Sequence, residues 1–291
     1  MELDRWNSIA AHIGQATGQP FQIVHPRSVS GGCINQGYKV THGTRSYFVK
    51  LNQATQIAMF EAEATGLEEI RATQTIRVPA PVCHSTIDNT AYLVLEWLEL
   101  GRGSAWAALG EQLAALHRVT SPNGFGWQRD NTIGSTPQPN PWTSDWIRFW
   151  SEHRIGFQLR LGQRKGGHFP KGDRLLAAIP DLLGNHRPVP ALVHGDLWSG
   201  NASTTSAGEP VIFDPATYYG DREVDLAMTE LFGGFPAEFY RSYNQAFPLD
   251  SGYPQRKPLY NLYHILNHFN LFGGSYEAQA NRTIEQLLTS N

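Results

Sequence analysis

An aspartate and an asparagine that follow a short apolar segment could carry a phosphoryl transfer. Leu192-Val193 continues into His194-Gly-Asp196-Leu-Trp-Ser-Gly-Asn201, which places the aspartate and the asparagine five residues apart. A carboxylate can orient and deprotonate an attacking hydroxyl, and a neutral amide oxygen can complete the shell of a Mg²⁺ ion without adding repulsive charge. We therefore predict that Asp196 is a catalytic base and that Asn201 is a magnesium ligand.

A second carboxylate follows the next apolar segment. Val211-Ile212-Phe213 ends in Asp214, the position at which a further metal-binding carboxylate is expected in a kinase-type site. Taken alone, either residue favours a structural interpretation, because aspartates often cap turns and loop asparagines often supply left-handed geometry. The order and spacing of the two segments together favour the site, and we predict Asp214 as the second magnesium ligand.

A lysine near the end of an apolar strand could hold the phosphates of ATP. Lys50 follows Tyr47-Phe48-Val49, and the predicted helix after it carries Glu61 and Glu63. Lysine can bind the α- and β-phosphates if a carboxylate on the following helix fixes it, and we favour Glu63 for that role. For Lys50 alone, the better interpretation is an edge-strand lysine whose ammonium reaches solvent. The downstream segments favour the phosphate role.

Two further stretches could contact the nucleotide through backbone groups. Residues 28–35 lie between the first two predicted strands, and their amides could cover the phosphates of ATP. This stretch lacks a G-x-G-x-x-G pattern and a Walker lysine, so a plain hairpin turn explains it equally well. We expect adenine to bind backbone groups at 96–98. The predicted nucleotide contacts are Gly31, Gly32, Glu96, Trp97 and Leu98.

The elements that must position these residues form two different halves. Period-2 patterns predict strands at 21–24, 37–41, 46–51, 82–86 and 91–95, with a helix at 56–71 between the third and the fourth. Helical periodicity then predicts helices at 106–119, 142–161, 174–183, from Val224 onward and at 257–272, with surface loops at 121–141 and 162–172. A further amphipathic helix is predicted at 1–19.

The fold class that follows is α+β with two lobes. Glycines at 101 and 103 mark the connection between the halves, and a cleft between two lobes is a common ligand site. We place the nucleotide-binding, β-rich lobe at residues 1–98 and the helical lobe, with the catalytic loop and the acceptor site, at residues 99–291.

Composition and charge narrow the class of partner. The 291 residues are 41% hydrophobic and carry a formal net charge of -3, which gives no basic footprint for nucleic acid or for a membrane surface. Only Cys33 and Cys83 occur, too few for a disulfide framework, and no apolar run is typical of a signal peptide or of a bilayer-spanning helix. We expect a cytoplasmic monomer or weak dimer that binds a small molecule.

Several segments resemble the fructosamine kinase (ketosamine kinase) family, a branch of the protein-kinase-like fold shared with aminoglycoside phosphotransferases and choline kinases. The resemblance covers nearly the whole chain. His194 to Asn201 is similar to the family's catalytic loop, and Trp198 distinguishes it from most aminoglycoside and choline kinases. Departures from the broader kinase pattern are the irregular glycine loop and Pro215, where protein kinases have phenylalanine. Other similar segments are Gly31–Asn35, Phe48–Lys50, Met59–Glu63, Val78–Pro81, Leu93–Trp97 and Tyr219–Met228.

The resemblance implies a specific reaction. ATP with Mg²⁺ would phosphorylate the C3 hydroxyl of a ketosamine, a sugar attached through C1 to an amine such as a lysine side chain. Phosphorylation there destabilises the adduct, so the implied role is deglycation repair. Trp198 and His194 would contact this acceptor. The resemblance does not choose among fructosamine, ribulosamine and erythrulosamine.

Alternative functions stay open at this stage. The same fold and chemistry could serve an aminoglycoside, choline or a plain sugar; the chain could be a catalytically silent nucleotide-binding protein; or it could be a structural protein with an accidental motif.

Other polar residues have structural interpretations. His264 and His268 have a helical spacing that suits zinc but lack an intervening glutamate, and Asp221 and Asp225 are expected to anchor a loop or a helix N-terminus.

Overall fold

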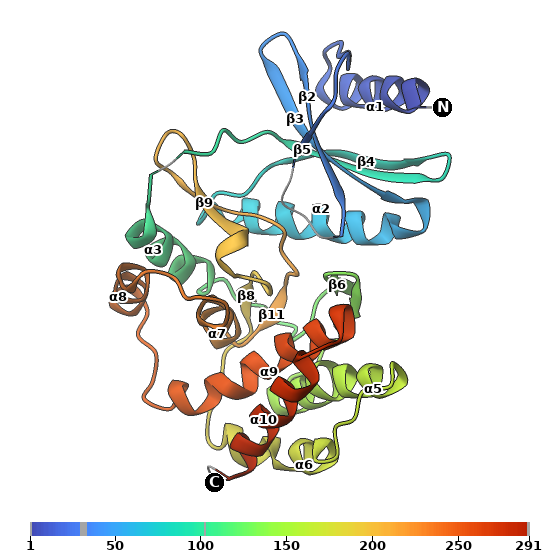
Figure 1. Cartoon of the computed structure of the whole chain (residues 1–291). Helices are drawn as coiled ribbons and strands as arrows, with labels where there is room; N and C mark the ends of the chain where they lie inside the picture. Colours follow the sequence, from blue (N-terminus) through green and yellow to red (C-terminus); the bar gives the residue numbers. More distant parts are fainter. Residues whose placement is uncertain (1, 30–33, 102, 290–291) are drawn as a thin grey trace.

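An antiparallel sheet with two helices stands above a larger helical lobe (Figure 1). The structure, a computed structural model, describes residues 2–29, 34–101 and 103–289. The five-stranded sheet has the order β1-β2-β3-β5-β4, with every neighbouring pair antiparallel. The predicted order of three strands, a helix and two strands is confirmed, as is the α+β class. The elements are α1 (Glu2–Thr17), β1 (Arg27–Val29), β2 (Gln36–His42), β3 (Arg45–Gln53), α2 (Ile57–Ala72), β4 (Pro81–Ile87) and β5 (Thr90–Glu96).

The first strand does not lie where the sequence predicts it. Residues 21–24 form an irregular segment, and the strand is β1 at Arg27–Val29. Phe21 and Ile23 are two positions apart, as apolar residues of a strand are, and both side chains are buried in one apolar cluster with α1. The spacing therefore reflects burial against α1 and not a strand. Prolines at 20 and 26 flank the segment and cannot donate to a strand ladder.

The alternation along β3 sets the direction of Lys50. Val49 and Leu51 are buried with Ile9 and Ile13 of α1 on one face of the sheet. Successive side chains of a strand point to opposite faces, so Lys50 points to the other face, which α2 covers. The strand pattern itself therefore brings the lysine to the helix that carries the predicted glutamate.

The second half is built mainly from helices and short strand pairs. Its helices are α3 (Trp106–Leu116), α4 (Trp146–Trp150), a π-helical turn (Ser151–Ile155), α5 (Gly156–Arg164), α6 (Gly172–Leu183), α7 (Glu223–Leu231), α8 (Ala237–Ala246), α9 (Tyr253–Phe272) and α10 (Tyr276–Thr289). The strand pairs are β6 (Asn131–Ile133) with β7 (Thr136–Gln138), β8 (Ala191–Val193) with β11 (Tyr218–Gly220), and β9 (Ala202–Thr204) with β10 (Pro210–Ile212). Among the described residues, no helix combines the length and the apolar character needed to span a bilayer.

Several boundaries in this half differ from the predictions. The helix predicted to start at residue 142 begins at Trp146, because the Asp145 side chain accepts a hydrogen bond from the Arg148 N–H at 3.2 Å and caps it. The surface loop predicted at 121–141 contains the β6–β7 hairpin, in which Asn131 and Gln138 are buried. Helices α8 and α10 were not predicted.

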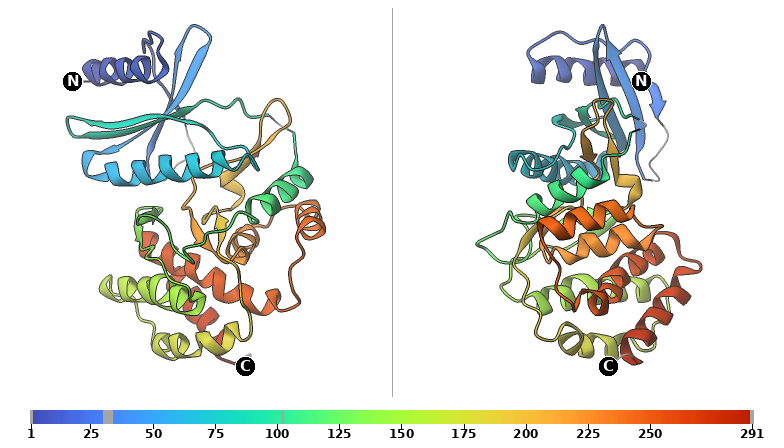
Figure 2. Two further views of the ribbon diagram at one scale, coloured as in Figure 1. Left: turned by 180° about the vertical axis from the view of Figure 1, so that it is seen from behind. Right: turned by 90° about the vertical axis from the view of Figure 1, so that its left-hand side faces the viewer.

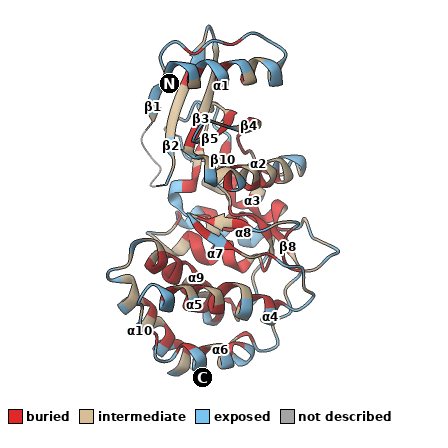
Figure 3. Cartoon of the chain, turned by 90° about the vertical axis from the view of Figure 1, so that its right-hand side faces the viewer, coloured by how far each residue is buried: buried red, intermediate tan, exposed pale blue. Residues whose placement is uncertain are grey.

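An apolar cluster in the middle of the molecule joins the two halves. Figure 3 shows buried positions on α3, α7 and β8, which lie below the sheet. We call this the middle cluster. Its buried residues include Met59, Phe60, Leu67, Ile70, Val78, Leu93 and Leu95 from the first half and Leu109, Leu113, Leu192, Ile212, Leu226 and Phe239 from the second.

The β9–β10 hairpin contacts the first half and the connection between the halves. Figure 2 shows it rising from the helical lobe beside that connection. The Gly101 N–H donates to the Thr204 carbonyl at 2.8 Å, and the Ile212 N–H donates to the Arg77 carbonyl at 3.0 Å. The bond from Ile212 to Arg77 therefore crosses from one half to the other, and the bond from Gly101 to Thr204 fixes the connection between them. The lobe boundary at residues 98 and 99 stays a prediction.

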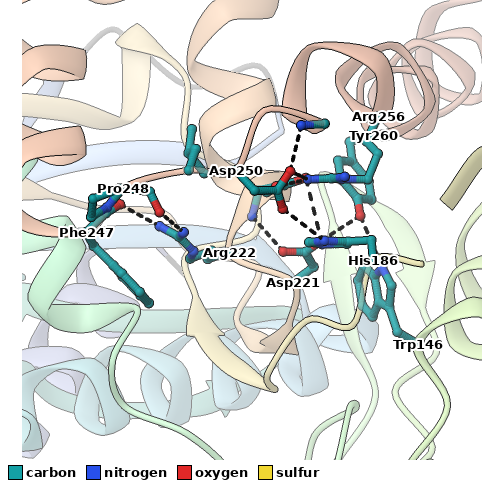
Figure 4. A network of polar contacts seen from close by, with 12 residues as sticks. Trp146, His186, Asp221, Arg222, Phe247, Pro248, Asp250, Arg256 and Tyr260 are labelled. Atoms are coloured by element: carbon teal, nitrogen blue, oxygen red, sulfur yellow. Dashed lines mark hydrogen bonds and ion pairs between the residues drawn. The ribbon is translucent and has the colours of Figure 1, made fainter. Parts of the chain in front are cut away.

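A network of charged side chains ties the N-terminus of α7 to α9 (Figure 4). Arg256 of α9 donates to both carboxylate oxygens of Glu223 at 2.8 and 2.6 Å and to Asp250 at 2.7 Å. His186 lies 2.7 Å from Asp221 through Nε2 and 3.4 Å from Asp250 through Nδ1. The expected anchoring role of Asp221 is confirmed by these contacts.

This network predicts a pH-dependent part of the stability. Burial lowers the pKa of His186, but the hydrogen bond to Asp221 and the charges of Asp221 and Glu223 outweigh it, so the pKa lies above its usual value of 6.5. A histidine with a raised folded-state pKa stabilises the fold fully below its unfolded pKa, and the gain is lost as pH rises through the folded pKa. We expect His186→Gln to remove this pH-dependent contribution to the free energy of unfolding. The contribution should be on the order of 1 kcal/mol, because the site is partly open to solvent.

Urea unfolding at pH 6 and pH 8.5 measures this effect. The wild type should lose more stability over that interval than His186→Gln, whereas exposed His84→Gln should behave as the wild type. Equal pH dependence in all three proteins would contradict the assignment.

Candidate active site

Lys50 lies between two carboxylates at the junction of the lobes. Its Nζ donates to Glu63 Oε1 at 2.6 Å and to Asp214 Oδ1, and the residue is only 5% exposed. Burial lowers the pKa of Lys50, but the charges and hydrogen bonds of Asp214 and Glu63 outweigh it and hold the pKa above its usual range. Lys50 is therefore a fixed cation. The predicted pairing with Glu63 is present, whereas Glu61 accepts from Arg129 at 3.0 Å.

Strand pairing brings the predicted base and the predicted metal ligands to the same junction. Asn201 Nδ2 donates to the Asp196 carbonyl at 2.9 Å and lies 3.4 Å from Asp196 Oδ2. Asn201 directly precedes β9 and Phe213 directly follows β10, and the Phe213 N–H donates to the Asn201 carbonyl at 3.1 Å. This bond places Asp214 beside the Asp196–Asn201 loop.

The environment of Asp196 suits a base near neutral pH. Burial, with the negative charges of Asp214 and Asp225, raises the pKa of Asp196 to about 7, against the lowering effect of Asn201. Its side chain is 24% exposed. A base whose pKa lies near the working pH combines the deprotonated state with a strong affinity for the proton.

Glycine at position 195 permits the tight turn before the base. Gly195 has φ +82°, and a Cβ there would lie 2.2 Å from the Ala216 carbonyl oxygen. The close approach lets the Ala216 N–H donate to the His194 carbonyl at 2.8 Å. Any side chain at 195 would separate the two loops that carry Asp196 and Asp214.

Asp225 of α7 fixes the backbone of this turn through hydrogen bonds. The residue is fully buried, and its carboxylate accepts from the N–H groups of His194 and Gly195 at 2.7 and 2.8 Å. Its other close partner is His117 Nε2, at 3.1 Å. Burial alone would raise the pKa of Asp225, but the hydrogen bonds and the positive potential of His117 hold the pKa below its usual range. The expectation that Asp225 is structural is confirmed.

His194 has a different role from the predicted one. Its side chain is fully buried; Nδ1 accepts from the Asp196 N–H at 3.2 Å, and Nε2 donates to the Phe213 carbonyl at 2.9 Å. Burial lowers the pKa of His194, so the ring is neutral, as these two bonds require. Both ring nitrogens are occupied by backbone groups, and the expectation that His194 contacts the acceptor does not fit. The ring joins the Asp196 loop to the Asp214 loop.

Trp198 stands at the surface of the same loop. Its side chain is 39% exposed, and its ring lies across Gly200, where a Cβ would be 2.3 Å from ring carbons. Glycine at 200 thus makes room for the indole. The open side of the ring can stack on a ligand beside Asp196.

The predicted adenine contacts are only partly available. The Glu96 N–H donates to the Ala80 carbonyl at 2.8 Å. The Glu96 carboxylate accepts hydrogen bonds from Arg77 and from the Ala80 N–H. The indole of Trp97 is covered by the Lys39 ammonium, 4.3 Å from the ring centre. An adenine contact would therefore use backbone groups of 96–98 other than the Glu96 N–H. Gly31 and Gly32 lie outside the described residues.

The oxygen ligands fit a magnesium ion. Asn201 directs its amide nitrogen toward Asp196, which leaves its oxygen for a cation, and the Asp214 side chain is 47% exposed. Asp214, two residues after the end of β10, has φ +56°, a left-handed conformation that aspartate tolerates. A carboxylate and an amide oxygen are the hard ligands that Mg²⁺ prefers.

Sequence reasoning missed a buried polar network under the Asp214 loop. Asn131 Nδ2 donates to the Thr217 carbonyl at 2.8 Å, and Gln138 Nε2 donates to the Ala216 carbonyl at 3.1 Å. Arg154 of the π-helical turn is fully buried, and its guanidinium carbon lies 4.1 Å from the centre of the Tyr218 ring. The polar residues of 121–141 have no periodicity, so the sequence offers no signal that separates this network from a surface loop.

Comparison with known proteins decides among the kinase families. The sequence model of the fructosamine kinase family matches residues 5–290. This chain belongs to the fructosamine kinase family. A protein named probable ketoamine kinase from Synechocystis is 61% identical over 97% of both chains. The chloroplastic protein-ribulosamine 3-kinase of Oryza sativa subsp. indica is 44% identical over 93% of this chain and 81% of its own.

Solved structures agree with this membership. A candidate fructosamine-3-kinase from Haemophilus somnus superposes with a TM-score of 0.92 at 33% identity, over 97% of both chains. An aminoglycoside phosphotransferase in complex with ADP and hygromycin B gives a TM-score of 0.63 at 15% identity, over 98% of this chain and 99% of its own, which shows the shared kinase-like fold. The kinase is thus a phosphotransferase with an alcohol group as acceptor.

Proposed function

We propose that this kinase transfers the γ-phosphoryl group of ATP to the 3-hydroxyl of ketosamines, namely ribulosamine or fructosamine adducts on amines or protein lysines, as a step of deglycation repair. The observation that carries the proposal is the loop in which Asp196, with a raised pKa, lies beside Asn201 and which also carries the exposed Trp198. The names of the relatives, ketoamine kinase and protein-ribulosamine 3-kinase, support the acceptor class.

Each residue has a task in this reaction. Asp196 accepts the proton of the acceptor hydroxyl while the hydroxyl oxygen forms a bond to the γ-phosphorus and the bond to the ADP oxygen breaks. Lys50, kept charged by Glu63, holds the α- and β-phosphates. Asn201 and Asp214 would hold Mg²⁺, which supplies positive charge to the phosphate oxygens. Positioning and charge supply most of the rate, because the transfer needs no covalent intermediate.

The exposed indole of Trp198 suits the amine of the acceptor. A secondary ammonium attached to C1 of the sugar can stack on the exposed indole face, at which a cation is attracted by the ring quadrupole. A plain sugar has no such charge. This difference supports a ketosamine over free ribose as the acceptor. A cytoplasmic location and a monomeric or weakly dimeric state stay predictions from the sequence.

An acceptor panel tests the proposal. ADP release with Mg-ATP is measured for a ribulosamine, a fructosamine, an aminoglycoside, choline and free ribose, with a 3-O-methyl ketosamine as the matched control that lacks the attacking hydroxyl. We expect turnover on the ketosamines and none on the methylated control. Turnover on another acceptor alone would keep the kinase mechanism and discard the repair role, and silence on every acceptor would favour a nucleotide-binding protein.

Deglycation needs its own measurement. A protein carrying ribulosamine on its lysines is incubated with the kinase and Mg-ATP, and the modified lysines are counted by mass spectrometry over time. We expect the adduct to gain a phosphate and then to be lost with recovery of free lysine. A phosphorylated adduct that persists on the protein would contradict the repair role.

A further inference from the structure

One histidine beside the predicted base has an unused ring nitrogen. His264 of α9 is 3% exposed, and its Nδ1 atom is shielded from solvent with no hydrogen-bond partner among the described residues. This nitrogen lies 4.0 Å from Asp196 Oδ1. A buried polar atom without a partner carries an energetic cost, so its position needs a reason.

The two oxygens of Asp196 have different surroundings. Oδ2 lies 3.4 Å from the Asn201 amide nitrogen, whereas Oδ1 faces His264. Helix α9 is held in place by two hydrogen bonds from residues just before His264. The Tyr263 hydroxyl donates to Gln138 Oε1 at 2.6 Å, and the Tyr260 hydroxyl donates to Asp221 at 2.5 Å. The imidazole is therefore presented to the carboxylate by a fixed support.

The ring of His264 is a neutral donor. Burial lowers its pKa to about 3, and the nearby His268 and Arg154 act in the same direction, although Asp225 opposes them. A neutral imidazole carries one N–H, and with the proton on Nδ1 it can donate to a carboxylate. His268 cannot replace it, because its own Nδ1 already bonds to the His264 carbonyl at 2.8 Å.

We propose that His264 is a positioning residue for the phosphoryl transfer: with ATP and acceptor bound, its Nδ1–H donates to Asp196 Oδ1 and holds the carboxylate so that the other oxygen receives the acceptor proton. A normal hydrogen bond requires the two groups to approach by about 1 Å, which is the kind of tightening that catalytic hydrogen bonds show in the complex with substrate. This inference rests on the proposed function, in which Asp196 is the base.

Three substitutions of His264 distinguish the loss of the hydrogen-bond donor from the loss of the ring's volume. Asparagine places an amide nitrogen close to the Nδ1 position, glutamine places it close to the Nε2 position, and leucine fills the space without a donor. We expect His264→Leu and His264→Gln to lower kcat by about 10- to 100-fold with KM for ATP changed less than about 2-fold, and His264→Asn to recover kcat to within about 3-fold of the wild type.

A double-substitution cycle tests whether His264 acts through Asp196. Single-turnover rates are measured with Asp196→Asn alone and with His264→Leu or His264→Gln added, and thermal unfolding with ATP checks that each protein folds. We expect the second substitution to change the Asp196→Asn rate less than about 2-fold. Wild-type kcat in His264→Gln, equal losses in His264→Asn and His264→Gln, or an undiminished loss in the Asp196→Asn background would overturn the positioning role. Full turnover by Asp196→Asn itself would instead remove the proposed base.

Discussion

We expect Asp196→Asn to turn over a ketosamine about 10³-fold more slowly than the wild type, within the usual contribution of a general base. The amide keeps the size of the carboxylate and its bond with Asn201 but cannot take the proton of the acceptor hydroxyl. KM for ATP should change little, because the phosphates are assigned to Lys50 and to the metal ligands. Steady-state ADP release with saturating Mg-ATP measures the effect.

The control for this prediction is a carboxylate far from the site. Asp88 lies exposed in the turn between β4 and β5 with φ +50°, a conformation that asparagine also tolerates. Asp88→Asn therefore removes the same charge without local strain and should keep the wild-type rate. Near-normal turnover at neutral pH by a folded Asp196→Asn protein would show that the base is another residue.

Asp225→Asn should destabilise the fold by about 3 kcal/mol and slow turnover by about 100-fold. Both carboxylate oxygens of Asp225 face N–H groups, those of His194 and Gly195, so an amide turns one acceptor into a donor that faces a donor. The residue is fully buried, and water cannot relieve the conflict. The turn before Asp196 then loses its geometry, which couples the loss of stability to the loss of rate.

Urea unfolding and kcat measured on the same preparations check this second prediction. Asp173→Asn is the matched control, because Asp173 is an exposed residue in the first turn of α6 and its substitution should cost less than about 0.5 kcal/mol. Stability and turnover of Asp225→Asn that both match those of Asp173→Asn would mean that the loop does not depend on the buried carboxylate.

Local patterns predict the parts of the fold that one element decides alone. The period-2 alternation of β3 separates Val49 and Leu51 from Lys50, and the helical period of α2 puts Glu63 on the same face as Phe60 and Leu67, which are buried. The pairing of Lys50 with Glu63 follows from those two periods. It could therefore be predicted without the structure.

Helix α10 and the β6–β7 hairpin are absent from the sequence predictions for different reasons. In α10, Ala280, Ile284 and Leu287 are buried at helical spacing, so the sequence carries a local signal for this helix. The β6–β7 hairpin has no such signal, because its buried Asn131 and Gln138 are satisfied by backbone groups of a distant loop. The approach of His264 to Asp196 is also a tertiary contact between separate segments. Periodicity within α9 indicates which side is buried but not which loop it meets.

The middle cluster makes the sheet half unsuitable as a removable module. Met59, Phe60 and Leu93 from before the connection pack in one cluster with Leu113 and Ile212 from after it. Cutting the chain between residues 98 and 99 would expose this apolar surface to water on both fragments. We therefore expect the sheet half and the helical half to unfold together as one cooperative unit, and grafting either onto a foreign partner would require redesign of the shared cluster.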